Sequence, residues 1–117
     1  QDDAQAAQWY RLAATQGYRS SQHGLGEMYD LGKGIDQNDQ QAVFWYTKAA
    51  NQGDTTASLW LTANQGDAGA QYRLGQVYEN GDNGSMIVDK DLAMRWYTKA
   101  ANQGHAEAQA KLADLQV

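Results

Sequence analysis

The sequence predicts an all-α protein built as an array of antiparallel helix pairs, and three observations lead to this prediction. A stretch of twelve residues occurs twice almost unchanged, at 42–53 and 93–104, with a looser copy at 6–17. Apolar residues within these copies recur at intervals of three and four, which is the period of an amphipathic helix. The chain contains no proline, as suits a protein that is mostly helix. Recurrence of one helical pattern identifies a repeat protein.

Each repeat begins with a helix that follows a glycine, here called helix A. Four such glycines are separated by 36, 13 and 38 residues, and a leucine lies eight residues after each of them. The glycines are Gly17, Gly53, Gly66 and Gly104. A small side chain also lies four residues after each glycine, so both offsets fall on one helical face. Gly26 and Gly75 occupy the same place inside helix A and indicate a close helix crossing, while Gly32 and Gly81 are expected to end the helix.

The second helix, helix B, is the repeated twelve-residue stretch itself. Acidic side chains stabilise a helix N-terminus, so we expect helix B to start near Asp39 and Asp89. Glycines at 53 and 104 are expected to end it. Its apolar stripe predicts the core of the array: Ala42, Trp45, Tyr46 and Ala49, repeated as Ala93, Trp96, Tyr97 and Ala100.

The predicted organisation is one repeat domain over residues 1–117. It contains two full repeats, flanking half-repeats and one truncated unit, at 1–17 (half), 18–53 (full), 54–66 (truncated), 67–104 (full) and 105–117 (half). We expect the truncated unit to form a short helix over about 55–64. The chain starts with Gln1 and lies out of register with the repeat, which predicts a piece of a longer protein. Half-repeats expose apolar faces, so a longer parent chain or self-association is expected to cover them.

Composition excludes several classes of partner. The formal net charge is −5 and the charges are spread along the chain, which argues against a nucleic-acid or anionic-membrane surface. No run of about 18 apolar residues occurs, so no membrane insertion is predicted. Without cysteine there is no thiolate metal site or disulfide, and periplasmic, secreted and cytoplasmic locations all stay open.

The residues of helix A, of the loop that follows it and of helix B follow the pattern A-x-x-x-L-G-x-x-Y, then G-x-G-I, then A-x-x-W-Y-x-K-A-A-x-Q-G. They lie at 21–29, where Ser21 stands in place of the alanine, at 32–35 and at 42–53, and again at 70–78 and 93–104. This pattern closely resembles the Sel1-like repeat, a relative of the tetratricopeptide repeat. The resemblance implies a right-handed α-solenoid whose helices A line a concave face. It also implies an adaptor role in protein–protein complexes, common in bacterial secreted, periplasmic and signalling proteins.

The motif residues of that family are structural, so the candidate binding residues come from positions on helix A that do not repeat in type. Such positions are predicted to face outward and to bind a protein or peptide partner. They are Gln22, His23, Glu27 and Asp30 in the first full repeat and Gln71, Tyr72, Gln76 and Glu79 in the second. The surface is polar and mildly acidic, which suits a partner with basic groups. The leading hypothesis is therefore a non-catalytic scaffold, although an ordinary solvent face fits the same residues.

The sequence contains few residues that could form the active site of an enzyme. His23 and His105 lie in different units, so no clustered metal ligands are predicted, and no cofactor is expected. No nucleophile motif or P-loop occurs. The alternative is a small-molecule binder or hydrolase-type enzyme with its site near the 54–66 junction, and a purely structural spacer also stays open.

Overall fold

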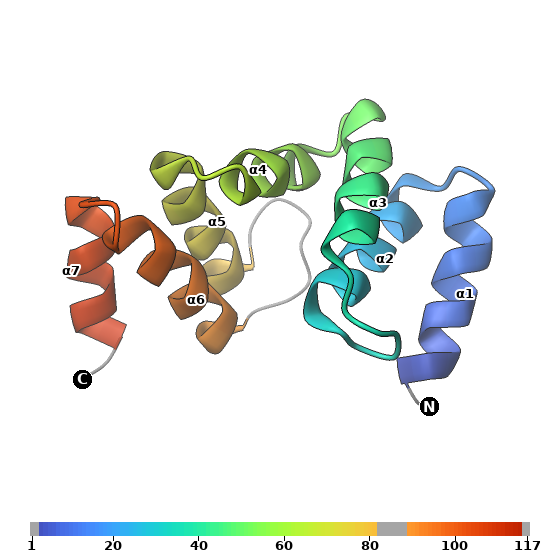
Figure 1. Cartoon of the computed structure of the whole chain (residues 1–117), viewed down its shortest axis with the longest axis horizontal. Helices are drawn as coiled ribbons and strands as arrows, with labels where there is room; N and C mark the ends of the chain where they lie inside the picture. The colour runs from blue at the N-terminus through green and yellow to red at the C-terminus, as the bar shows by residue number, and fades with distance from the viewer. Residues whose placement is uncertain (1–2, 82–88, 116–117) are drawn as a thin grey trace. The chain divides into compact units, whose positions relative to one another are not determined.

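The computed structural model describes residues 3–81 and 89–115, and within them seven α-helices and no strand occur (Figure 1). The helices are α1 (Asp3–Thr15), α2 (Arg19–Leu31), α3 (Asp39–Asn51), α4 (Thr55–Asn64), α5 (Ala68–Asn80), α6 (Lys90–Ala101) and α7 (Ala106–Leu115). The all-α prediction is confirmed. The short helix expected over about 55–64 is also confirmed, because α4 covers that range.

Two compact units divide the chain, residues 1–58 and residues 59–117, and each is described by itself. In the first unit α2 packs against α1 and α3, and in the second α6 packs against α5 and α7. The pairs α2–α3 and α5–α6 are therefore the helix A–helix B pairs of the two full repeats. By sequence, α1 is a helix B and α7 is a helix A.

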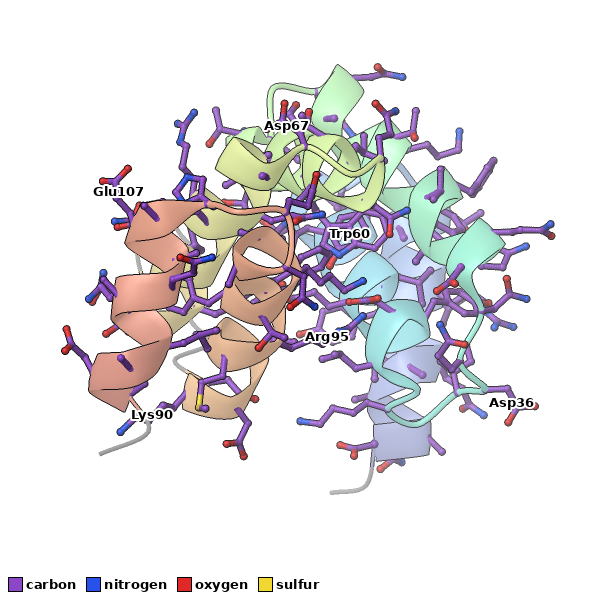
Figure 2. The ribbon with its side chains drawn as sticks, turned by 60° about the vertical axis from the view of Figure 1, so that its left-hand side comes forward. Asp36, Trp60, Asp67, Lys90, Arg95 and Glu107 are labelled. Atoms are coloured by element: carbon purple, nitrogen blue, oxygen red, sulfur yellow. The ribbon has the colours of Figure 1, made fainter. Side chains whose placement is uncertain are left out.

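Local signals set the helix ends. Asp67 (labelled in Figure 2) and Asp89 precede α5 and α6, and each side chain accepts a hydrogen bond from the backbone N–H three residues later, at 2.8 and 3.0 Å. These bonds satisfy N–H groups that have no partner within the helix. Helices α2 and α5 end at Gly32 and Gly81, whose φ angles of 71° and 73° are left-handed and favour glycine.

The core of each unit centres on a tyrosine of helix B that lies over a glycine of helix A. Tyr46 and Tyr97 are 1% and 0% exposed. A Cβ placed on Gly26 would lie 3.1 Å from the ring of Tyr46, and one on Gly75 would lie 2.6 Å from the ring of Tyr97. The close helix crossing predicted from these glycines is confirmed.

The tryptophans of the three helix B copies differ in burial. Trp96 in α6 is 0% exposed, Trp45 in α3 is half-buried, and Trp9 in α1 is 64% exposed. Helix α6 packs against a helix on each side, whereas α1 packs mainly against α2. The core prediction therefore holds for Trp96 and only in part for Trp45. The exposed apolar face expected of the first half-repeat is present.

Candidate functional site

Buried glutamines join the helices of each repeat. Gln22 Nε2 donates to the carbonyl of Ala14 at 3.3 Å, and Gln71 Nε2 donates to the carbonyl of Ala63 at 3.0 Å. Gln109, the equivalent residue of α7, donates to Ala101 O at 3.1 Å. In three helices A, a glutamine therefore donates a hydrogen bond to a carbonyl in the last turn of the preceding helix.

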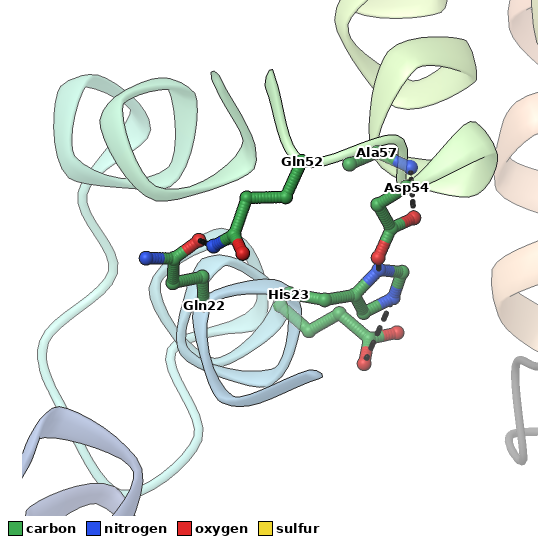
Figure 3. Close-up of polar contacts among 6 residues, drawn as sticks. Gln22, His23, Gln52, Asp54 and Ala57 are labelled. Carbon is green, nitrogen blue, oxygen red and sulfur yellow. Dashed lines mark hydrogen bonds and ion pairs between the residues drawn. The ribbon is translucent and has the colours of Figure 1, made fainter. Parts of the chain in front are cut away.

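A second glutamine, at the end of helix B, forms hydrogen bonds to the start of helix A in each full repeat. Gln52 Nε2 lies 2.8 Å from both Gln22 Oε1 and the carbonyl of Gly17 (Figure 3). In the second repeat Gln103 Nε2 lies 3.0 Å from Gln71 Oε1 and 2.8 Å from the carbonyl of Gly66. We call these two pairs the glutamine clamps.

The prediction that Gln22 and Gln71 face outward is wrong. They are 4% and 5% exposed, because each side chain turns into the junction between helices to satisfy backbone carbonyls. Asp30 is also buried, at 5% exposure, at the helix A position where the equivalent Glu79 turns toward helix B. These three residues therefore leave the candidate surface.

Replacing Gln71 with leucine is expected to lower the free energy of unfolding by about 2 kcal/mol, because the carbonyl of Ala63 would stay buried without its donor. The same change at the exposed Gln109 should cost less than about 0.5 kcal/mol. Urea denaturation followed by circular dichroism measures both changes. Equal losses at the two positions would show that the clamp contributes nothing beyond the shared bond.

His23 lies between two carboxylates in the first unit (Figure 3). Its Nδ1 is 3.0 Å from Asp54 Oδ2, and its Nε2 is 3.7 Å from Glu27 Oε1. Asp54 also accepts the backbone N–H of Ala57 at 2.8 Å and so holds the start of α4. The ring of His23 meets that of Tyr46 edge-on at 5.5 Å. The three polar side chains are 12–14% exposed, so they form a partly accessible, acidic cluster.

The second unit places an aromatic pair at the equivalent positions. Tyr72 replaces His23, His105 replaces Asp54, and the two rings stack at 4.7 Å. His105 Nδ1 accepts the backbone N–H of Ala108 at 3.1 Å, which repeats the capping role of Asp54. Gln76 donates to the hydroxyl of Tyr72 at 3.4 Å. The same junction therefore carries different chemistry in the two repeats.

Glu79 connects three helices of the second unit. Tyr97 donates its hydroxyl to Glu79 Oε1 at 2.6 Å, and Lys111 donates to Glu79 Oε2 at 3.3 Å. The Tyr97 hydrogen bond, together with Lys111 and against the effect of burial, holds the pKa of Glu79 below its usual value. Burial and the same carboxylate raise the pKa of Tyr97. The cluster thus favours an ionised Glu79 and a neutral Tyr97.

Acid should weaken the second unit through Glu79. Because its pKa is lower in the folded than in the unfolded chain, the carboxylate stabilises the fold above its ordinary pKa of 4.5, and this contribution is lost as the pH falls through the folded-state pKa. The Tm difference between wild type and Glu79→Gln is therefore expected to be larger at pH 7 than at pH 3. Glu107→Gln, at an exposed carboxylate (Figure 2), is the control for losing one charge. A Tm difference that stays constant with pH would contradict this assignment.

Sequence reasoning missed Asp54, His105 and the glutamine clamps. A signal for the clamps was present, because glutamine follows Gly17, Gly66 and Gly104 at the fifth residue and precedes Gly53 and Gly104 directly. Within the described ranges, no group of three or more His, Asp or Glu residues is placed to hold a metal ion. No helix in that part of the chain is long and apolar enough to cross a membrane.

Comparison with known proteins gives the family. The family model of the Sel1 repeat matches residues 1–18, 19–54 and 68–105. No curated protein matches the chain.

Two solved structures are similar to it. One is a protective antigen of uropathogenic Escherichia coli strains with an SLR fold, 34% identical over 95% of this chain, with a TM-score of 0.55. The other is a Sel1 repeat protein from Oxalobacter formigenes, 33% identical over 97% of this chain, with a TM-score of 0.51. This chain spans 28% and 55% of their lengths. The helical repeat, its buried motif residues and these matches show that the chain belongs to the Sel1 repeat family.

Proposed function

We propose that the protein is a non-catalytic scaffold that binds a protein or peptide partner through the variable, partly accessible positions of α2 and α5. Sel1 repeat proteins are generally protein–protein interaction scaffolds. One observation carries the proposal. Repeated positions such as Leu25 and Leu74 are buried, whereas the half-buried pairs His23/Tyr72 and Glu27/Gln76 differ between repeats.

The surface differs in character between the two units. In the first, Glu27, His23 and Asp54 present carboxylate oxygens around an imidazole. This arrangement favours a basic group such as lysine or arginine on the partner. In the second, the stacked rings of Tyr72 and His105 offer an aromatic contact, and aromatic residues are enriched at interfaces. The first unit therefore favours a basic side chain of the partner, and the second unit favours an apolar or aromatic one.

A peptide library displayed on phage tests this proposal, followed by fluorescence polarisation with the selected peptides. Glu27→Ala and Tyr72→Ala are each expected to weaken binding about fivefold or more, because each removes one polar or aromatic contact worth about 1 kcal/mol. Glu107→Ala, an exposed carboxylate on α7, is the matched control and should leave binding unchanged. Peptides that bind both variants as tightly as wild type would remove the proposed surface.

The enzyme alternative near 54–66 has no specific observation in its favour. The His23–Asp54 pair has the orientation of an imidazole held by a carboxylate, but Nε2 faces Glu27 rather than a hydroxyl. Two hollows lie along α1, and no residue of 54–66 lines either of them. We therefore propose the non-catalytic role that is typical of Sel1 repeat proteins.

A further inference from the structure

Each of the four glycine turns is followed by a residue that stands at the start of the next helix. This residue is Tyr18, Asp54, Asp67 and His105 in turn. Tyr18 makes no side-chain hydrogen bond to the start of its helix. The other three side chains each accept the backbone N–H three residues later, at 2.8, 2.8 and 3.1 Å. Two of these helix caps therefore use a carboxylate oxygen, and the cap of α7 uses an imidazole nitrogen.

The bond to Ala108 requires one particular form of the His105 ring. The backbone N–H of Ala108 is the donor, so Nδ1 of His105 must be the acceptor and carries no hydrogen. A histidine with one acceptor nitrogen is neutral and carries its proton on Nε2. A ring that is protonated on both nitrogens has two donors and cannot accept this bond. The cap of α7 is therefore made only while His105 is neutral.

Aromatic rings of two helices lie behind His105. Tyr72 of α5 stacks on its ring at 4.7 Å, and the ring of Tyr97 of α6 lies 5.6 Å from that of Tyr72. A stacked tyrosine attracts a cation, so it partly favours a protonated His105. The positive end of the α7 dipole lies at the same place and disfavours a cation there. Because protonation also breaks the bond to Ala108, the start of α7 loses stability when the ring gains a proton.

Charged side chains of the second unit do not compensate a proton on His105. Glu107, in the first turn of α7, is exposed. Lys111 of α7 donates to Glu79 of α5, and Lys99 of α6 lies over a tryptophan ring. In the part of the chain that the structure describes, His105 forms no ion pair. No carboxylate is therefore placed to hold the protonated ring where it is.

His23, the other histidine of the chain, has the opposite surroundings. Its Nδ1 lies 3.0 Å from Asp54 Oδ2, and its Nε2 lies 3.7 Å from Glu27 Oε1. A protonated ring keeps both contacts, because each nitrogen then faces a carboxylate. The helix cap at this junction is made by Asp54 Oδ1 and not by the ring. A proton on His23 therefore leaves the start of α4 capped.

We propose that His105 makes the start of α7 sensitive to acid, because a proton on its ring breaks the cap on Ala108 and loosens the first turn of the helix. Histidine gains its proton between about pH 8 and pH 5, so the cap is present at the upper end of this range and lost toward the lower end. The caps made by Asp54 and Asp67 stay intact, since carboxylates gain protons mainly below about pH 5. Acid therefore acts selectively on the cap of α7.

Amide hydrogen exchange, followed by NMR at pH 8 and pH 5, tests the proposal. Exchange is expressed as a protection factor, which removes the direct effect of pH on the exchange rate. The protection factor of the Ala108 amide is expected to fall about fivefold at pH 5, which corresponds to the loss of one helix cap. The amides of Ala57 and Ala70 are controls within the same sample, because carboxylates cap them at 2.8 Å. Their protection should be the same at both pH values.

Two substitutions of His105 and one of His23 assign the effect to a single ring. His105→Asn keeps a capping oxygen that takes up no proton in this range, and His105→Asp copies the caps of the other two turns. In both variants the protection of Ala108 should no longer depend on pH. His23→Gln changes the histidine of the other unit and should leave the fivefold fall at Ala108 as in the wild type. Protection at Ala108 that is constant with pH in the wild type, or that falls equally in His105→Asn, would overturn the proposal.

Discussion

Replacing Trp96 with alanine is expected to lower the free energy of unfolding by about 4 kcal/mol, because the indole is fully buried and its removal leaves a cavity. Trp96 is the largest residue of the repeated helix B motif. Arg95 and Lys99 cover its ring, with cationic groups 5.4 and 5.1 Å from the ring centroid. Chemical denaturation followed by circular dichroism gives the loss without relying on tryptophan fluorescence.

The repeat supplies its own controls for this prediction. Trp9 and Trp45 occupy the same motif position in α1 and α3, with Trp9 exposed and Trp45 half-buried. Trp9→Ala is therefore expected to cost less than about 1 kcal/mol and Trp45→Ala an intermediate amount. Similar losses at all three positions would mean that the motif, rather than its burial, determines the stability.

Replacing Gly75 with alanine is expected to destabilise the second unit by about 2 kcal/mol. The added methyl group would lie 2.6 Å from the ring of Tyr97, and that ring cannot move freely because it is buried and bonded to Glu79. Alanine favours the helix over glycine by about 1 kcal/mol, which offsets part of the overlap. Gly26→Ala should cost less, since the ring of Tyr46 lies further away, at 3.1 Å.

A double-mutant cycle separates the two effects at Gly75. In a Tyr97→Ala background the overlap with the ring is gone, so Gly75→Ala should become stabilising by about 1 kcal/mol through helix propensity alone. Thermal and urea unfolding of the four proteins measure the cycle. A loss that persists without the ring would place the strain elsewhere in α5.

The sequence was sufficient for the helix pairs because their signals repeat. Gly26 and Gly75 share an offset within helix A, and each meets the tyrosine that repeats in helix B. The short helix α4 could also be predicted, since the pattern before Leu61 matches a helix A start. Each of these predictions depends on the spacing of residues along one helix, and the folded chain keeps the helices that this spacing predicts.

The candidate surface was harder to predict, because a polar residue on a helix is usually taken as exposed. Gln22, Gln71 and Asp30 are buried, and the glutamines satisfy carbonyls in turns that a helical wheel does not show. The partners of His23 and Tyr72 come from the turn after helix B, more than 30 residues later. Contacts of that kind depend on how the helix pairs stack, and side-chain spacing within one helix does not reveal them.

The glutamine clamps also indicate where the two full repeats of this chain differ in length. The clamp joins Gln52 to Gly17 across 35 residues and Gln103 to Gly66 across 37, with the same bond length of 2.8 Å. Both ends of each pair are fixed at the glycine turns, so the difference of two residues falls in the loop between helices A and B. Insertions there leave the hairpin closed, since longer surface loops cost little. That loop is therefore where evolution or engineering can add a new segment to a repeat while the stacking of its helices is kept.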